Sequence, residues 1–135
     1  MAVADRSGLP VAVGIASGQR HEQKLVVETL NTRFVEPLPE KLIGDTAYDS
    51  DPLDAQLAGM GVEMIAPPHP RRRTKTQDLR KLRRYRRRWH IERLFAWMMR
   101  CRRLVSRYEC KAKNFLGFVQ LACIVILSRR LRDAF

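Results

Sequence analysis

The segment DLRKLRRYRRRWHIERLFAWMMRCRR, residues 78–103, determines how the rest of the chain is interpreted. Its apolar and aromatic residues recur at helical spacing, which predicts one long helix over Asp78–Arg103. From Arg71 to Arg107 the chain has sixteen Lys and Arg residues but only two acids, Asp78 and Glu92. A carboxylate in so cationic a segment is either a structural counter-ion or a group that works beside a polyanion.

The charge of the chain is unevenly distributed. Its 135 residues, 45% hydrophobic and 30% charged, are typical of one globular domain, or most of one. The net charge is +12, yet residues 1–66 contain five basic and ten acidic residues. All of the positive excess therefore lies in the second half. Such a basic block indicates contact with a polyanion, with nucleic acid favoured over an anionic membrane.

The cysteine content and the apolar runs indicate where in the cell the protein is located. The three cysteines show no metal-ligand spacing, which fits a reducing cytosol. The longest apolar run, 115–127, is interrupted by Gly117 and Gln120 and is shorter than the roughly twenty residues that span a bilayer. We therefore expect a cytoplasmic, nucleoid-associated protein with no membrane partner.

Periodicity and turn residues predict alternating strands and helices. The expected elements are a strand over 9–16 that forms the second arm of a hairpin, a helix over 21–34, a strand over 41–44, a short helix that starts at Ser50 or Asp51, a strand over 62–66, a basic linker over 67–77, the long helix, and a last helix over 115–132. This order predicts an α/β fold with at least one parallel strand pair. The last helix is apolar on most faces, so we expect it to be buried against the sheet.

One face of the predicted long helix carries side chains that could bind DNA or a metal ion. At about 100° per residue, Tyr85, Arg88 and Glu92 fall within one sector of roughly 60°, together with Met99. An arginine and a tyrosine so placed suit contact with a DNA phosphate or a terminal strand. The simpler alternative is that Glu92 serves as the counter-ion of Arg88 one turn away.

A second candidate is Asp45, at the carboxyl end of the strand 41–44, where α/β sheets commonly bind ligands. Two carboxylates from separate elements can hold Mg²⁺, which prefers oxygen ligands. The simpler alternative is that Asp45 only begins a turn.

Taken together, these residues resemble a known family. YRRRWHIERLFAWMMRCRRLVSRYE, residues 85–109, is similar to the C-terminal signature of DDE-type insertion-sequence transposases, a tyrosine, arginine, glutamate and lysine at fixed spacing. Tyr85, Arg88 and Glu92 match, whereas Met99 replaces the lysine and Arg100 follows it. LIGDTAYDSD, residues 42–51, resembles the block around the second catalytic aspartate, which corresponds to Asp45.

The resemblance implies a ribonuclease-H-like mixed sheet flanked by helices and two divalent ions, Mg²⁺ or Mn²⁺. Asp45 and Glu92 would be catalytic metal ligands. The DNA-binding residues would be Tyr85, Arg84, Arg87, Arg88, Arg100 and Arg103. A first catalytic aspartate is expected on a strand upstream of Gly8-Leu9-Pro10, and Asp5 corresponds to a non-catalytic turn acid. Residues 1–135 are then the C-terminal part of a transposase catalytic domain, with the basic linker 67–77 inside it.

Three functional hypotheses follow. The favoured one is a fragment of a transposase that cleaves and transfers DNA strands. It would be inactive alone, and it would act on double-stranded transposon ends and target with the upstream frame or a second copy as partner. The second is a non-catalytic basic DNA-binding fragment that inhibits a full-length transposase. The third is a basic helix that binds RNA or a membrane surface.

Overall fold

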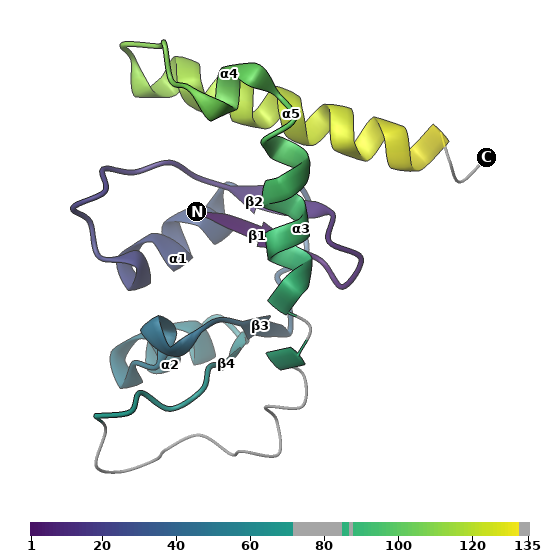
Figure 1. The fold of residues 1–135 in the computed structure, drawn as a ribbon. Helices are drawn as coiled ribbons and strands as arrows, with labels where there is room; N and C mark the ends of the chain where they lie inside the picture. Colours follow the sequence, from purple (N-terminus) through teal and green to yellow (C-terminus); the bar gives the residue numbers. More distant parts are fainter. Residues whose placement is uncertain (72–84, 87, 133–135) are drawn as a thin grey trace.

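The computed structural model describes residues 1–71, 85, 86 and 88–132, which form a mixed α/β arrangement (Figure 1). The elements are β1 (Ala2–Ala4), β2 (Pro10–Val13), α1 (Glu22–Asn31), β3 (Lys41–Ile43), the 3₁₀ turn η1 (Thr46–Tyr48), α2 (Asp51–Ala58), β4 (Glu63–Ile65), α3 (Trp89–Met98), α4 (Arg102–Val105) and α5 (Ala112–Arg132).

The strands confirm the predicted pairings. β1 and β2 form an antiparallel hairpin in which Ala2 lies opposite Val13. β3 and β4 run parallel, with Leu42 opposite Met64. The mixed α/β class is thus confirmed. Because the described strands form two separate sheets, β1-β2 and β3-β4, rather than one, the ribonuclease-H-like sheet stays a prediction.

The hairpin turn is fixed by Asp5 and Gly8. The Oδ1 atom of Asp5 accepts hydrogen bonds from the backbone N–H groups of Ser7 and Leu9, both at 2.8 Å. Gly8 has φ +78°, a conformation that a side chain disfavours. Asp5 is therefore used as a turn acid.

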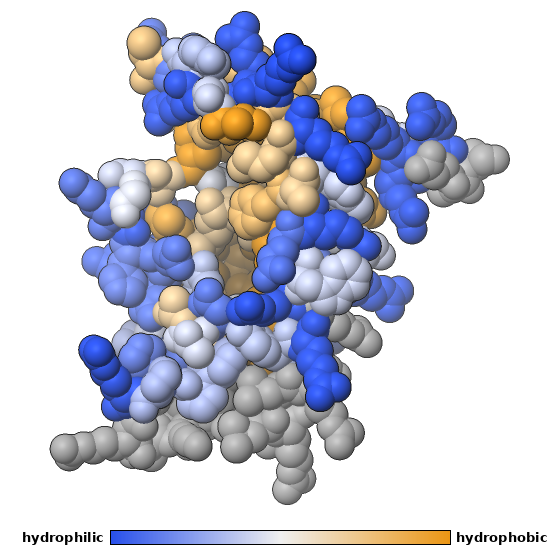
Figure 2. All heavy atoms as spheres, in the orientation of Figure 1, coloured by the Kyte–Doolittle hydropathy of each residue, from blue (hydrophilic) through white to orange (hydrophobic). Residues whose placement is uncertain are grey.

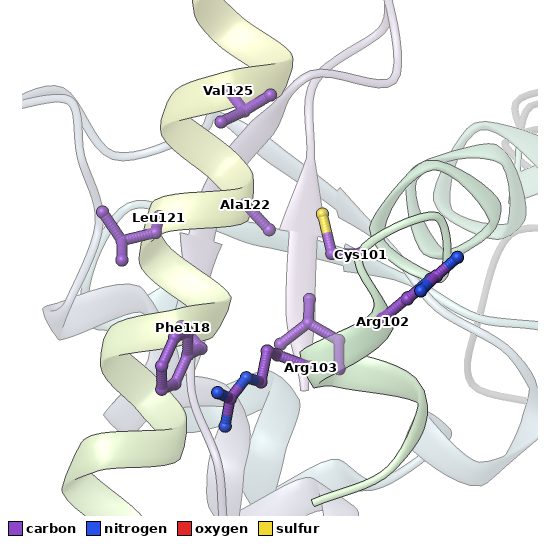
Figure 3. Close-up of a pocket in the computed structure, with 8 residues that line it drawn as sticks. Cys101, Arg102, Arg103, Phe118, Leu121, Ala122 and Val125 are labelled. Atoms are coloured by element: carbon purple, nitrogen blue, oxygen red, sulfur yellow. The ribbon is translucent and has the colours of Figure 1, made fainter.

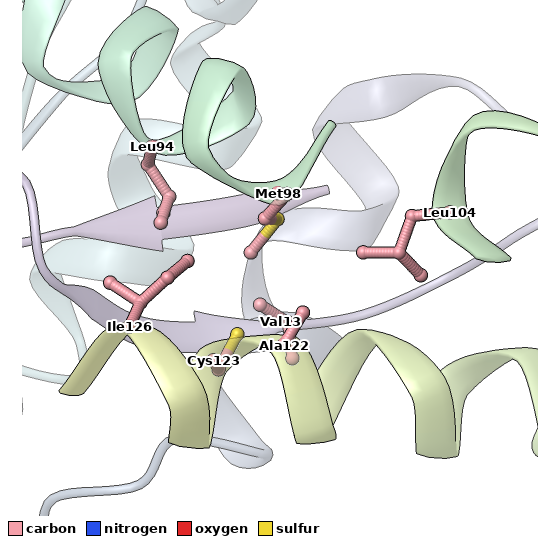
Figure 4. Close-up of a cluster of buried hydrophobic side chains, with 7 residues drawn as sticks. All are labelled: Val13, Leu94, Met98, Leu104, Ala122, Cys123 and Ile126. Carbon is pink, nitrogen blue, oxygen red and sulfur yellow. The ribbon is translucent and has the colours of Figure 1, made fainter. Parts of the chain in front are cut away.

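Two apolar cores lie on either side of β1. Val13, Leu94, Met98, Leu104, Ala122, Cys123 and Ile126 form the first core, between the hairpin and the helices α3, α4 and α5 (Figure 4). Val26, Leu30, Leu53, Leu57, Val62, Met64 and Ala66 form the second core, around α1, α2 and β4. Ala2 and Ala4 pack against the first core and Val3 against the second, as the alternating directions of strand side chains require.

The prediction of one continuous helix over 78–103 is wrong at its carboxyl end. α3 ends at Met98, Cys101 is extended at φ −87° and ψ 106°, and the short helix α4 follows. In an unbroken helix Leu104 would point about 120° away from Met98, whereas the break turns it into the first core beside that residue (Figure 4). The predicted first part, residues 78–84, lies outside the described residues.

α5 also differs from its prediction. It starts at Ala112 rather than 115 and buries one face only, leaving Leu121 and Ile124 each 56% exposed and Leu131 62% exposed. Its 21 residues are long and apolar enough to cross a bilayer, contrary to the expectation that this run is too short. Core helices of soluble proteins share this length and composition, so α5 alone does not indicate a membrane span.

One matched pair of substitutions tests this one-sided packing of α5. Ile126 is 9% exposed in the first core and Ile124 is 56% exposed two residues away. Ile126→Ala is expected to lower the free energy of unfolding by about 2–5 kcal/mol, because it removes buried methyl groups and leaves a cavity. Ile124→Ala is the control and should change it by about 0.5 kcal/mol at most. Chemical denaturation measures both, and equal losses would contradict the assigned face.

Candidate active site

Tyr85, Arg88 and Glu92 form a connected row that runs into the first turn of α3. The Nη1 atom of Arg88 donates a hydrogen bond to the Tyr85 hydroxyl at 2.7 Å, and its guanidinium lies 5.2 Å from the centre of that ring. The Nε atom of Arg88 lies 3.7 Å from Oε1 of Glu92, one turn along. The three side chains are therefore in contact, although Tyr85 and Arg88 lie in a 3₁₀ segment before α3 and not in the predicted α-helix.

The row is open to solvent. The side chains of Arg88 and Glu92 are 49% and 65% exposed. An exposed ion pair at this distance adds at most about 1 kcal/mol to stability. The counter-ion alternative is thus realised as a contact, but the contact is weak enough for the carboxylate and the guanidinium to exchange it for ligands.

Asp45 lies where the sequence predicts it, directly after β3 and Gly44. Its Oδ1 atom accepts the backbone N–H of Ala47 at 2.9 Å and so caps η1, which matches the turn-acid alternative. Asp45 is exposed to solvent. Its Oδ2 atom accepts no hydrogen bond from the described residues.

The backbone around Asp45 is held tightly by its neighbours. Gly44 donates its N–H to the carbonyl oxygen of Ile65 at 3.0 Å, which extends the β3-β4 pairing to the residue before Asp45. A Cβ atom at Gly44 would collide with Met64 and lie 2.7 Å from the Tyr48 ring. Tyr48 is half-buried, and burial, with the charges of Glu22 and Asp45 adding to it, raises the pKa of its hydroxyl to about 12. Neither Met64 nor Tyr48 was predicted from the sequence to lie beside Asp45.

The two predicted metal ligands belong to separate elements, because Asp45 caps η1 and Glu92 lies in the first turn of α3. Across the described residues no group of three His, Cys, Asp or Glu side chains is close enough to hold a metal ion. The ligand chemistry of the two carboxylates fits a divalent ion, whereas their number does not complete a two-ion site. Met99, at the lysine position of the family signature, is 52% exposed at the end of α3.

The other predicted DNA-binding arginines differ in their surroundings. Arg100 is exposed. Arg103 is also exposed, but its Nη1 atom lies 3.5 Å from Glu109 and its guanidinium 5.6 Å from the Phe118 ring. Arg84 and Arg87 lie outside the described residues, as does most of the basic linker 67–77.

A pocket of about 290 Å³ lies between α4 and α5 (Figure 3). Its lining residues are Cys101, Arg102, Arg103, Leu104, Phe118, Leu121, Ala122 and Val125. Its walls are mainly apolar, and neither Asp45 nor Glu92 takes part in them. On the face shown in Figure 2, apolar surface gathers below α4 and is bordered by hydrophilic side chains. This pocket is therefore not the candidate active site.

The family assignment comes from comparison with known proteins. A family model described as the transposase DDE domain matches residues 1–127. The chain therefore belongs to the family of transposase DDE domains, which confirms the resemblance drawn from the signature residues.

One relative is the putative transposase for insertion sequence element IS402 of Burkholderia cepacia. It is 34% identical over 96 residues, which cover 71% of this chain and 42% of the relative. The chain thus matches less than half the length of that protein. No solved structure matches.

The environment of Asp45 can be tested through Tyr48. The raised pKa means that the neutral hydroxyl of Tyr48 is favoured in the folded protein. The stability that this preference contributes is therefore complete below about pH 10. It should be lost as the pH rises from about 10 to about 12. Absorbance titration should show one of the three tyrosines ionising near pH 12.

Substitutions at Tyr48 and Asp45 test what raises the pKa of the Tyr48 hydroxyl. Tyr48→Phe should remove the late ionisation, and Asp45→Asn should lower its midpoint because one nearby negative charge is gone. Tyr108→Phe is the control, since this ring is 73% exposed. Three coincident ionisations in the unchanged protein would contradict the packing around Asp45.

Proposed function

We propose that this chain is the part of a DNA transposase that supplies two of its three catalytic carboxylates, Asp45 and Glu92. The observation that carries the proposal is the row of Tyr85, Arg88 and Glu92, in which the exposed carboxylate of Glu92 lies beside an exposed arginine able to bind phosphate. Family membership supports a role in transposition, and double-stranded DNA, as transposon end and target, is the proposed substrate.

The cationic side chains would bind the DNA backbone. Arg88 would contact a phosphate next to the cleaved bond while Tyr85 holds its guanidinium through the 2.7 Å hydrogen bond. Arg84, Arg87, Arg100 and Arg103 would neutralise neighbouring phosphates. Arg103 would do so while still paired with Glu109, because its side chain is 63% exposed.

Asp45 and Glu92 would hold Mg²⁺ or Mn²⁺, two ions in a complete site. When bound, these ions supply stabilisation of the entering and leaving oxygens in phosphodiester cleavage. The chain's own contribution is to hold Asp45 through the η1 cap and to present Glu92 from α3.

The proposed partner is a segment that brings the third carboxylate. Each described sheet has two strands and therefore open edges able to accept another strand. We place the first catalytic aspartate on an upstream strand that pairs with such an edge and is supplied by the upstream transposase frame. A second copy of this chain would be an additional partner, because it brings the same two carboxylates and not the third. A cytoplasmic, nucleoid-associated location follows from the proposed substrate.

The second candidate is a non-catalytic DNA-binding fragment that regulates a full-length transposase. The Arg88–Glu92 ion pair favours it, because a glutamate that serves only as a counter-ion needs no metal. The two candidates differ in whether Asp45 and Glu92 matter for chemistry.

Cleavage assays separate the two. Chain 1–135 alone is expected to show little Mg²⁺-dependent nicking of an element end, because two carboxylates hold two ions poorly. Together with a segment that carries the upstream aspartate strand, nicking should appear and be lost in Asp45→Asn and Glu92→Gln. Glu28→Gln, which removes an exposed glutamate paired with Arg20, is the control and should leave nicking intact. Robust nicking by the chain alone would refute the predicted dependence on a third carboxylate.

DNA affinity tests the role of the arginines. Arg88→Gln should weaken binding to duplex DNA and lower the slope of log affinity against log salt by about 1, since one phosphate contact is lost. Arg20→Gln, which removes an arginine already paired with Glu28, is the charge-matched control and should leave the slope unchanged. Fluorescence anisotropy over a salt series measures both, and equal slopes for Arg88→Gln and the unchanged chain would exclude Arg88 from the interface.

A further inference from the structure

Arg93, the residue after Glu92, is held between two tryptophans. Its guanidinium carbon lies 4.7 Å from the centre of the Trp89 ring and 5.0 Å from that of Trp97. The two rings lie one turn before and one turn after Arg93 on α3, so three side chains stack along one helix face. Cation–π attraction of this kind favours a fixed position for the guanidinium.

The same guanidinium also contacts the β1-β2 turn. Its Nη2 atom donates a hydrogen bond to the carbonyl oxygen of Ser7 and lies 3.2 Å from Nδ1 of His90. A Cβ atom at Gly8 would be only 2.7 Å from Nη2 and 3.0 Å from Nε. The turn held by Asp5 therefore fits closely around Arg93.

These contacts separate Arg93 from the arginines proposed to bind DNA. Its Nε atom is buried, and no described group accepts a hydrogen bond from it. Nη2 is already engaged with the hairpin and His90. Arg93 is only partly buried, but with Nε buried and Nη2 held by the hairpin it is less available to a phosphate than the exposed Arg88.

Fixing Arg93 also fixes Glu92. Neighbouring residues of a helix point about 100° apart, so the rotation of α3 that seats Arg93 between the hairpin and the tryptophans determines the direction of Glu92. That direction is toward solvent, where its side chain is 65% exposed beside Arg88.

We propose that Arg93 is a positioning residue that locks α3 onto the β1-β2 turn through Trp89, Trp97 and Ser7 and thereby sets the direction of Glu92. The part that concerns Glu92 as a metal ligand rests on the proposed function. The contacts of Arg93 with Trp89, Trp97 and Ser7 do not depend on the proposed function. These contacts and the direction of Glu92 are measured separately.

The test uses the fact that Trp89 and Trp97 are the two tryptophans of the chain. Chain 1–135 labelled with 5-fluorotryptophan should give two ¹⁹F resonances. Arg93→Lys keeps the charge but loses the planar stacked group, so both resonances should shift while the far-ultraviolet circular dichroism stays unchanged. Arg130→Lys, at an exposed arginine of α5, should move neither. Unshifted resonances in folded Arg93→Lys would overturn the proposal.

A glycine pair provides a second test that does not change Arg93. Gly8→Ala would press a methyl group against the Arg93 guanidinium and bring it 3.2 Å from the His90 carbonyl oxygen, whereas Gly61→Ala meets open space at nearly the same φ, +75° against +78°. The two positions are thus matched in φ. Gly8→Ala should shift the tryptophan resonances, although residue 8 is distant from both in sequence, and Gly61→Ala should not. Identical spectra for the two variants would overturn the proposed contact.

The effect on Glu92 is read from Mn²⁺ broadening of the same resonances. In the unchanged chain Mn²⁺ should broaden the Trp89 signal more than the Trp97 signal, and Glu92→Gln should abolish this. Arg93→Lys should alter the ratio of the two broadenings, and an unaltered ratio would refute the positioning of Glu92. Absence of broadening in the unchanged chain would count against the proposed metal role of Glu92, and the resonance shifts would still decide whether the lock exists.

Discussion

The packing of α3 against the β1-β2 hairpin is the contact on which the rest of the structure depends. Leu94 is fully buried and Met98 nearly so, and both belong to the first core together with Val13 of β2. α5 reaches the same core from its far side through Cys123 and Ile126. Without this contact α3 would have no fixed orientation, because a helix of ten residues is barely stable in isolation.

Much of the fold could be predicted because it follows from local chemistry. The turn at Asp5 and Gly8, the helix start at Ser50 with Pro52 in its first turn, and the glycine after α2 each depend on residues close in sequence. The row of Tyr85, Arg88 and Glu92 was predictable for the same reason, since helical spacing alone brings these side chains together.

The remaining features depend on partners distant in sequence. The break after Met98 is explained by the burial of Leu104 against α5, and periodicity within 78–103 contains no information about α5. The partial exposure of α5 likewise depends on how much of it the hairpin and α3 cover. In the sequence Arg93 is one of sixteen cations between residues 71 and 107. A tryptophan four residues before it and another four residues after it are the signal that could have identified its stacking.

The side chains of β1, which point alternately into the two cores, couple the stability of one core to that of the other. Its three residues send Val3 into one core and Ala2 and Ala4 into the other, so each core is completed by the same short strand. Opening of β1 would expose apolar surface in both cores at once, and neither would keep its full stability alone. The elements around the first core and those around the second core are therefore expected to unfold as one cooperative unit. The protection of the β1 amides from hydrogen exchange should then reflect global unfolding rather than local fraying.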